Sequence, residues 1–360
     1  MSPRPLALAL TAGAALLARR AVRRRIEGSP LWPLPALAEP VSGRPRHRSL
    51  RLTVAAHEVV AEGVVQLRLE GRELPGWEPG AHLDLVLPSG LVRQYSLCGD
   101  PADTSAYTIA TRLVPDGRGG SREVHEGLRA GMTVEVRGPR NRFPLAPAPA
   151  YVFVAGGIGI TPILPMLRAV ADRPGLEWRL LYGGRSRASM PYLAEIEKLG
   201  SGAGSGRVTV VAEDEDGLPD LDALFAGVAA ELPEGTAVHC CGPQGLTAAV
   251  EARIPEGAVL RLERFAPRTS AAGNQAFEVE LRCSGRTLTV AADSTVLAAV
   301  RKELPDTAYS CEQGFCGTCR QRVLAGEVDH RDELLTDAER ADSMLICVSR
   351  ARRGPLVLDL

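Results

Sequence analysis

The sequence predicts a multidomain chain with three folded units, and three observations support this prediction. Short stretches of alternating apolar and polar residues, separated by Gly and Pro turns, fill residues 49–148. A continuous apolar stretch and a Gly-rich turn open residues 149–267, and a cysteine-rich loop lies within residues 268–360. A length of 360 residues allows two to three domains with their own cores. We therefore expect an antiparallel β barrel or sandwich, then an α/β unit, then a smaller C-terminal unit of strands and a helix.

The composition argues against two classes of protein. Apolar residues make up 45% of the chain and charged residues 24%, which is ordinary for a globular protein. The formal net charge of −1 provides no large basic field to neutralise phosphates, which argues against nucleic acid as a partner. Eight cysteines in 360 residues are too few for a disulfide-stapled secreted scaffold, so we expect a reducing, cytoplasmic location.

Residues 1–48 differ from the rest of the chain. Residues 5–18 are apolar, and five arginines follow them: Arg19, Arg20, Arg23, Arg24 and Arg25. The apolar run is shorter than the ~20 residues that a spanning helix needs, and a secretory signal carries its basic residues in front of such a run. Two interpretations remain: an extension without regular structure, and a segment in residues 5–25 that contacts anionic lipid at the inner face of the membrane. Five prolines between Pro30 and Pro45 then predict a linker.

The unit at residues 49–148 contains five runs that predict strands, at residues 50–55, 64–69, 82–87, 107–113 and 132–137. Turn signals such as Pro75-Gly76 and Ser89-Gly90 separate them. Short strands at this spacing are typical of an antiparallel barrel or sandwich.

Two features of this unit suit a flavin. Residues 93–97 read R-Q-Y-S-L at the end of a strand, and residues 117–121 read G-R-G-G-S before a helix expected to start near Arg122. Arg93 can hold a phosphate through two hydrogen bonds, and backbone N–H groups at a Gly-rich helix start bind anions. Tyr95 offers an aromatic face for an isoalloxazine ring. Each feature alone also fits an ordinary core residue or turn, but together they predict a flavin site.

The unit at residues 149–267 changes to an α/β pattern. Residues 151–155 form a continuous apolar run of the kind buried in parallel sheets. The Gly-rich turn at residues 156–162 and a helix carrying Leu164 follow it, which predicts a site for a dinucleotide pyrophosphate. The turn is not the strict G-x-G-x-x-G, so the motif alone is weak. Further strands are expected at residues 178–182, 208–212 and 237–241.

The last of these strands ends in Cys240 and Cys241, followed by Gly242 and Pro243. Ligands of α/β sheets bind at the carboxyl ends of the strands, so we expect Cys241 to face the nicotinamide. Cys240 should point to the other face, because neighbours on a strand alternate. The alternative for both residues is ordinary burial, since cysteine is among the most buried residue types.

The unit at residues 268–360 carries four cysteines: Cys311, Cys316, Cys319 and Cys347. Their order is the C-x4-C-x2-C…C spacing of a plant-type [2Fe–2S] cluster. All-cysteine zinc sites usually consist of two C-x2-C pairs, so zinc is the weaker alternative. A hairpin at residues 277–290 and a helix at residues 295–303 are expected before the loop. His330 raises the question of a Rieske-type site, but no second His-containing pair accompanies it.

The motifs, taken in order over residues 49–360, closely resemble those of phthalate dioxygenase reductase and of the vanillate demethylase reductases. The resemblance implies an FMN-binding antiparallel β barrel, an α/β nucleotide-binding domain of the ferredoxin-reductase type and a C-terminal α+β ferredoxin domain with a β-grasp fold. Relatives that use FAD usually carry the ferredoxin in front, so FMN is favoured over FAD. The resemblance also favours NADH over NADPH, although Arg185 and Arg187 could accommodate a 2′-phosphate.

The resemblance also assigns residues to the sites. The flavin pocket would comprise Arg93, Gln94, Tyr95, Ser96, Thr111, Gly119, Gly120 and Ser121. The nicotinamide dinucleotide would contact Gly156, Gly157, Gly159, Thr161, Pro162, Arg185, Cys241, Gly242 and Pro243. The reacting rings would lie against Tyr95, Ser96 and Cys241.

These expectations combine into an NAD(P)H-dependent oxidoreductase that transfers electrons. A nicotinamide gives up two electrons as hydride and a [2Fe–2S] cluster accepts one at a time, so a flavin is needed between them. The expected partner is an oxygenase, foremost a Rieske-type aromatic-ring dioxygenase or O-demethylase. The alternatives are a reductase for a cytochrome P450 or a membrane-bound hydroxylase, and a non-enzymatic iron–sulfur redox sensor. The sequence identifies neither the partner nor its substrate, nor the oligomeric state.

Overall fold

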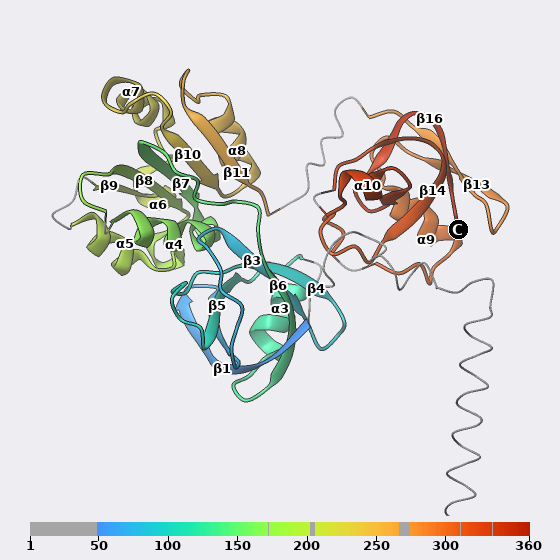
Figure 1. Ribbon diagram of the computed structural model, residues 1–360, viewed down its shortest axis with the longest axis horizontal. Helices are drawn as coiled ribbons and strands as arrows, with labels where there is room; N and C mark the ends of the chain where they lie inside the picture. Colours follow the sequence, from blue (N-terminus) through green and yellow to red (C-terminus); the bar gives the residue numbers. More distant parts are fainter. Residues whose placement is uncertain are drawn as a thin grey trace, which may run out of the picture. The chain divides into compact units, whose positions relative to one another are not determined.

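The computed structural model describes residues 49–117, 119–171, 173–201, 206–265, 274–309, 311–332 and 334–360. The expectations for residues 1–48 lie outside this part of the chain. The described residues form one six-stranded and two five-stranded sheets (Figure 1).

The first sheet is the predicted barrel. Its strands are β1 (Ser49–Ala61), β2 (Val64–Glu70), β3 (Ala81–Val86), β4 (Val92–Ser96), β5 (Ala106–Arg112) and β6 (Thr133–Asn141), all paired antiparallel in the order β4-β3-β6-β1-β2-β5. The two edge strands approach each other, because Leu97 bridges to Ile109 and the Cys98 N–H donates to the Thr108 carbonyl at 2.9 Å. These contacts close the sheet on itself, so it is a barrel and not a sandwich.

Strand β1 is longer than the predicted residues 50–55. It continues to Ala61 through two register shifts in its pairing with β2, between Val54 and Ala56 and between Val59 and Ala61. An irregularity adds a residue on one strand and reverses the alternation of faces. The apolar alternation therefore stops in the sequence at the point where the strand bends.

Helical residues in the barrel begin two positions before the predicted Arg122. Helix α3 (Gly120–Arg122) runs directly into η1 (Glu123–Gly127), a π-helical turn. Gly119 precedes α3 with a φ of 78°, a left-handed conformation that glycine adopts readily.

The second sheet is entirely parallel, as predicted. Its strands are β7 (Ala150–Gly156), β8 (Glu177–Gly184), β9 (Gly206–Ala212), β10 (Ala237–Cys241) and β11 (Val259–Glu263), in the order β11-β10-β7-β8-β9. The helical segments are η2 (Gly157–Gly159), α4 (Ile160–Ala171), η3 (Arg187–Ser189), α5 (Leu193–Gly200), α6 (Glu213–Asp216), α7 (Leu221–Glu231) and α8 (Gln244–Glu251).

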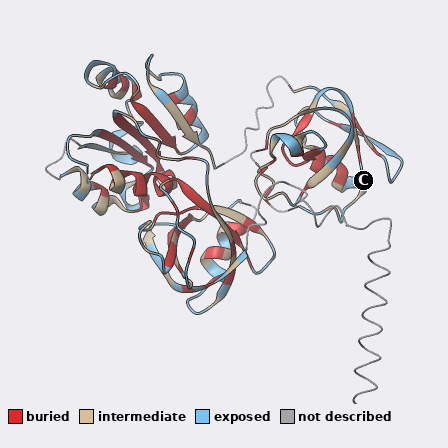
Figure 2. Ribbon diagram, in the orientation of Figure 1, coloured by how far each residue is buried: buried red, intermediate tan, exposed pale blue. Residues whose placement is uncertain are grey.

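Helices cover both faces of this sheet, which explains the continuous apolar run in β7 (Figures 1 and 2). Tyr151, Phe153 and Ala155 pack with residues of α4 and α5 on one face. Val152 and Val154 pack with residues of α7 and α8 on the other. Every residue of β7 is buried.

The third sheet has the order β13-β12-β16-β14-β15, in which β12 and β16 are parallel. Its strands are β12 (Phe277–Leu281), β13 (Arg286–Val290), β14 (Arg320–Asp329), β15 (Ser343–Leu345) and β16 (Arg350–Leu358), and its helices are α9 (Val296–Glu303) and α10 (Asp337–Arg340). The hairpin and the helix predicted here are confirmed, with Thr295 as the N-cap of α9. The cysteine loop lies between α9 and β14, and Cys347 lies between β15 and β16.

Among the described residues, no helix combines the length and apolar character that crossing a bilayer requires.

Candidate functional site

A cavity of about 740 Å³ lies where the barrel, the α/β unit and the cysteine loop meet. Eight of the predicted site residues line it: Arg93, Gln94, Tyr95, Ser96, Thr111, Gly120, Ser121 and Thr161. Gln313 and Phe315 from the cysteine loop also line it, as do Leu262, Glu263 and Phe265 at the end of β11. The cavity has the size of a cofactor pocket.

The charge of the cavity suits phosphorylated ligands. Its walls contain five arginines, namely Arg93, Arg112, Arg142, Arg264 and Arg331. The acidic residues among its walls are Glu263 and Asp332. This excess of guanidinium groups favours anions such as the phosphates of a flavin nucleotide or a dinucleotide.

Residues 93–96 of strand β4 line the cavity. Tyr95 pairs with Leu83 and packs against the barrel core, and burial raises the pKa of its phenol to about 12. The phenol is therefore protonated at neutral pH. Arg93 lies across the start of α3, where a Cβ on Gly120 would come within 2.4 Å of the Arg93 Nε atom. Only glycine at position 120 leaves room for this approach.

His82 lines the same cavity and was not predicted from the sequence. Within the described part of the chain, neither of its ring nitrogens has a hydrogen-bond partner, and only 3% of the residue is exposed. Burial, together with the nearby Arg140 and Arg142, lowers its pKa to about 3. The ring is therefore neutral, and a bound ligand would supply the partner that this buried polar group lacks.

The backbone of the Gly-rich turn lies directly against the backbone at the end of β10, the strand that ends in Cys241. A Cβ on Gly159 would come within 2.2 Å of the Cys241 carbonyl oxygen, and a Cβ on Gly156 within 2.6 Å of Pro243 Cδ. A Cβ on Gly242 would lie 3.0 Å from Gly156 Cα. The structure therefore brings together the two segments predicted for the dinucleotide.

Among the described residues, most of those predicted for the dinucleotide lie outside the cavity walls: Gly156, Gly157, Gly159, Pro162, Arg185, Cys241, Gly242 and Pro243. Gly119 of the predicted flavin set lies outside as well. Thr161 does line the cavity. Arg185 is exposed after β8, and its carbonyl accepts a hydrogen bond from the Asp214 N–H at 3.1 Å.

Cys241 and Cys240 occupy opposite faces of the sheet, as their alternation predicts. Both are fully buried. Burial raises the pKa of the Cys241 thiol well above its ordinary value, and the nearby Glu263 carboxylate raises it further. The thiol is therefore protonated at neutral pH and is not a nucleophile.

Glu263 connects the barrel with the α/β unit and was missed in the sequence. The Ser96 hydroxyl donates to Glu263 Oε2 at 3.4 Å, and the Cys241 thiol lies 3.8 Å from the same oxygen. Glu263 ends β11 and pairs with Cys241 in the parallel register. The position of Glu263 at the carboxyl end of a strand could have identified it. However, β11 was not among the strands predicted from the sequence.

The four predicted cluster cysteines form two pairs. Cys311 is hydrogen-bonded to Cys316, and Cys319 to Cys347. The hydrogen bond from Cys311 lowers the pKa of Cys316 to about 5, and the same bond raises the pKa of Cys311. Cys311, Cys319 and Cys347 are buried, whereas Cys316 is partly exposed.

This arrangement fits a dinuclear cluster. A [2Fe–2S] cluster needs two thiolates on each of two irons, whereas a zinc site needs four ligands around one ion. Gly314 and Gly317 adopt φ values of 80° and 78°, which lets the loop turn tightly. The Gln313 N–H donates to Cys311 Sγ at 3.3 Å.

His330 does not join the cysteines. Its Nδ1 atom lies 3.5 Å from Asp332 Oδ1, and both residues line the cavity. A Cβ on Gly314 would lie 3.1 Å from Asp332 Cα, so the segment carrying His330 packs against the cysteine loop. Gln313 also connects this loop to the end of the α/β unit, because its Nε2 donates to the Phe265 carbonyl at 2.9 Å.

Comparison with known proteins agrees with this arrangement. Residues 279–352 match the model of the 2Fe-2S iron-sulfur cluster binding domain, and residues 153–252 match the oxidoreductase NAD-binding domain. The chain is 41% identical over 325 residues to the vanillate O-demethylase oxidoreductase of a Pseudomonas species, covering 86% of this chain and 100% of that protein.

Two solved structures are similar to this one. Phthalate dioxygenase reductase, described as a modular structure for electron transfer from pyridine nucleotides to [2Fe–2S], shares 36% identity and a TM-score of 0.61 over 87% of this chain and 98% of that chain. An intact type IV self-sufficient cytochrome P450 monooxygenase shares 39% identity and a TM-score of 0.65 over 91% of this chain. This chain spans 44% of that longer protein. The chain therefore belongs to the phthalate dioxygenase reductase family of oxygenase reductase components, whose cofactors are NADH, FMN and a [2Fe–2S] cluster.

Proposed function

We propose that the protein passes electrons from NADH through FMN and a [2Fe–2S] cluster to a separate Rieske-type oxygenase that hydroxylates or demethylates an aromatic acid. The observation that carries this proposal is the shared cavity, whose walls include Ser96 of the barrel, Thr161 of the α/β unit and Phe315 of the cysteine loop. When bound, FMN supplies chemistry that accepts the electron pair of a hydride and releases single electrons to the cluster. We place the domain boundaries at residues 49–148, 149–267 and 268–360, and the protein in the cytoplasm.

For FMN, the phosphate is proposed to lie between Arg93 and the start of α3. Gly119, Gly120 and Ser121 would offer backbone N–H groups there, and Arg93 a bidentate guanidinium. The ring would lie against Gln94, Tyr95, Ser96 and Thr111. The protonated Tyr95 phenol provides an apolar face and a polar edge.

For NADH, the pyrophosphate is proposed to lie at the turn formed by Gly156, Gly157, Gly159, Thr161 and Pro162, where α4 begins. Cys241, Gly242 and Pro243 would border the nicotinamide, and Arg185 the adenosine. Because its thiol stays protonated, Cys241 contributes contact and not nucleophilic attack. Glu263 would orient the Ser96 hydroxyl at the meeting point of the two rings.

For the cluster, we assign Cys311 and Cys316 to one iron and Cys319 and Cys347 to the other. This assignment follows the two hydrogen-bonded pairs. The partly exposed Cys316 marks the side at which a partner would receive electrons.

A cytochrome P450 is the second candidate partner. A specific observation favours it: the chain resembles part of a self-sufficient cytochrome P450 monooxygenase at 39% identity. In this second proposal, a P450 would accept single electrons from the cluster in place of the Rieske-type oxygenase.

We also propose that residues 5–25 contact the inner face of the membrane. The apolar residues 5–18 would lie among the acyl chains near the surface, and the arginines that follow would bind anionic headgroups.

Replacing one cluster ligand should remove the [2Fe–2S] cluster and leave the flavin in place. In Cys316→Ser, the flavin should still be reduced by NADH, but the cluster's absorption and electron paramagnetic resonance signal should be lost, because serine oxygen is a harder ligand than a thiolate. Iron and sulfide analysis checks this result. Cys283→Ser, which changes an exposed cysteine outside the cluster set, should keep both signals. Purified parent protein that contains zinc instead of iron would contradict the assignment.

The Arg93→Ala variant should bind FMN about 10- to 100-fold more weakly, since one charge-assisted contact contributes about 1.5–3 kcal/mol. Riboflavin, which lacks the phosphate, should bind the variant and the parent equally well. Equilibrium dialysis of the apoprotein with each flavin measures both constants. If the variant loses affinity for riboflavin to the same degree, Arg93 does not hold the phosphate.

The partner is tested by anaerobic mixing of the NADH-reduced protein with a purified aromatic-acid Rieske oxygenase or with a ferric cytochrome P450. We expect rapid anaerobic oxidation of the reductase by the Rieske oxygenase only, and, once dioxygen is admitted, product formed in step with NADH consumption. Faster reduction of the P450, measured as its carbon monoxide complex, would support the second candidate instead.

Membrane contact is tested by sedimenting the full chain with vesicles of phosphatidylglycerol and phosphatidylcholine. Binding should occur at low salt and weaken at high salt, because the attraction is electrostatic. Replacing Arg19, Arg20, Arg23, Arg24 and Arg25 by alanine should abolish it. Equal binding of parent and variant, or no binding of either, would refute the proposal.

A further inference from the structure

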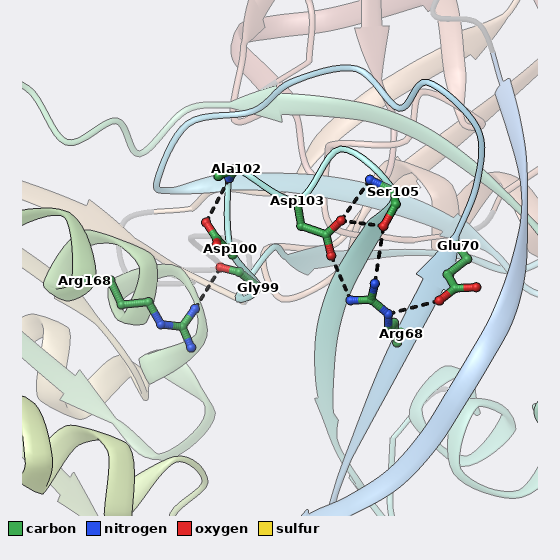
Figure 3. Close-up of polar contacts among 8 residues, drawn as sticks. All are labelled: Arg68, Glu70, Gly99, Asp100, Ala102, Asp103, Ser105 and Arg168. Atoms are coloured by element: carbon green, nitrogen blue, oxygen red, sulfur yellow. Dashed lines mark hydrogen bonds and ion pairs between the residues drawn. The ribbon is translucent and has the colours of Figure 1, made fainter.

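Arg168 connects the α/β unit to the barrel, because its guanidinium donates hydrogen bonds to residues of both units. Its Nε and Nη2 atoms donate to Glu195 Oε1 and Oε2 at 2.6 and 2.9 Å. Its Nη1 atom donates to the carbonyl oxygens of Cys98 and Gly99, both at 2.8 Å. Figure 3 shows the contact with Gly99. We call this set of four hydrogen bonds the Arg168 bridge.

The bridge joins the two segments to which the cofactors are assigned. Cys98 lies two residues beyond Ser96, the last residue of β4. Arg168 lies on α4, the helix that begins directly after the Gly-rich turn. Thr161, in the cavity wall, and Arg168 lie about two turns apart on this helix, so a shift of Arg168 would also move the start of α4. The guanidinium therefore ties the flavin-side strand to the dinucleotide-side helix.

The barrel side of the bridge is itself held in place (Figure 3). The Asp100 carboxylate accepts from the Ala102 N–H at 2.9 Å. The Asp103 carboxylate accepts from the Ser105 N–H at 2.9 Å and from Arg68 Nη1 at 2.9 Å. Arg68 belongs to β2 of the barrel. The loop after β4 is thus held to the barrel by hydrogen bonds at both of its ends.

An apolar cluster next to the Arg168 bridge also joins the α/β unit to the barrel. Ile158, within the Gly-rich turn, and Tyr192 pack with Val64, Cys98 and Ala110 of the barrel. The Tyr192 hydroxyl also donates to Gln66 Oε1 at 2.8 Å. Tyr192 has a φ of 63°, which costs energy in a residue that is not glycine. The contacts of Tyr192 with the barrel offset the energetic cost of this backbone conformation.

We propose that Arg168 is a positioning residue that sets the approach of the nicotinamide to the flavin. This inference rests on the proposed function, because it assumes that β4 borders the flavin and that the turn before α4 holds the dinucleotide. Hydride transfer requires the reacting atoms within about 3–3.5 Å, and a misplacement of about 1 Å can lower the rate by up to about 100-fold. Arg168 touches neither ring and acts only through the segments that it joins.

The test is rapid anaerobic reduction of the holoenzyme by NADH in the Arg168→Ala variant. We expect the limiting rate of flavin bleaching at saturating NADH to fall at least ~10-fold, with the dissociation constant for NADH changed less than ~3-fold. Flavin content, iron content and reduction by dithionite should equal those of the parent. A limiting rate within about twofold of the parent would overturn the proposal, as would a rate loss that matches a loss of bound flavin.

Two further variants sharpen the test. Arg253→Ala removes an arginine from the same unit, where it pairs with the exposed Asp222 at 2.9 Å, and should retain the parental rate. Glu195→Gln keeps the Arg168 contacts with both carbonyls but weakens the paired carboxylate, so its limiting rate should lie between those of the parent and Arg168→Ala. A rate below that of Arg168→Ala would contradict the bridge. If the proposed function itself were wrong, the parent enzyme would not be bleached by NADH.

Discussion

The rest of the proposed dinucleotide site depends on the direct contact between the Gly-rich turn before α4 and the end of β10. At Gly159 the two backbones are so close that an added Cβ would come within 2.2 Å of the Cys241 carbonyl oxygen. This contact fixes where α4 starts relative to the carboxyl edge of the sheet. It therefore also fixes Thr161 in the cavity wall and Arg168 two turns further along the same helix. A side chain at position 159 would push the turn away from the end of β10.

Burial and charge divide the site into parts with different tasks. The thiol of Cys241, outside the cavity walls, and the phenol of Tyr95, in those walls, keep their protons and so carry no charge. The guanidinium groups around the cavity provide the charge, and they suit phosphates rather than a proton transfer. We expect such a site to position two flat rings without a general acid or base, consistent with electron transfer by cofactors that bring their own chemistry.

Much of this organisation was predictable from the sequence because it depends on local pattern. The buried strand β7 was recognised from its apolar run, since both faces of the sheet are covered. The cluster loop was recognised from cysteine spacing, since a loop must bend in one way to pair its thiolates. Contacts between distant segments were not predictable. Glu263 ends a short, half-buried strand that was not predicted, and Arg168 looks like an ordinary surface residue of a helix. Their partners lie 167 and 70 residues away in the chain, so only the fold brings them together.

The uneven burial of the four cluster cysteines affects how dioxygen can reach the cluster. Three of the thiols are enclosed, and Cys316 is partly open to solvent. Small oxidants therefore have one side from which to approach, and it is the side assigned to the docked oxygenase. A partner docked over Cys316 would keep dioxygen away from the reduced centre. The contact proposed to draw electrons out of the protein would thus also limit their escape as superoxide.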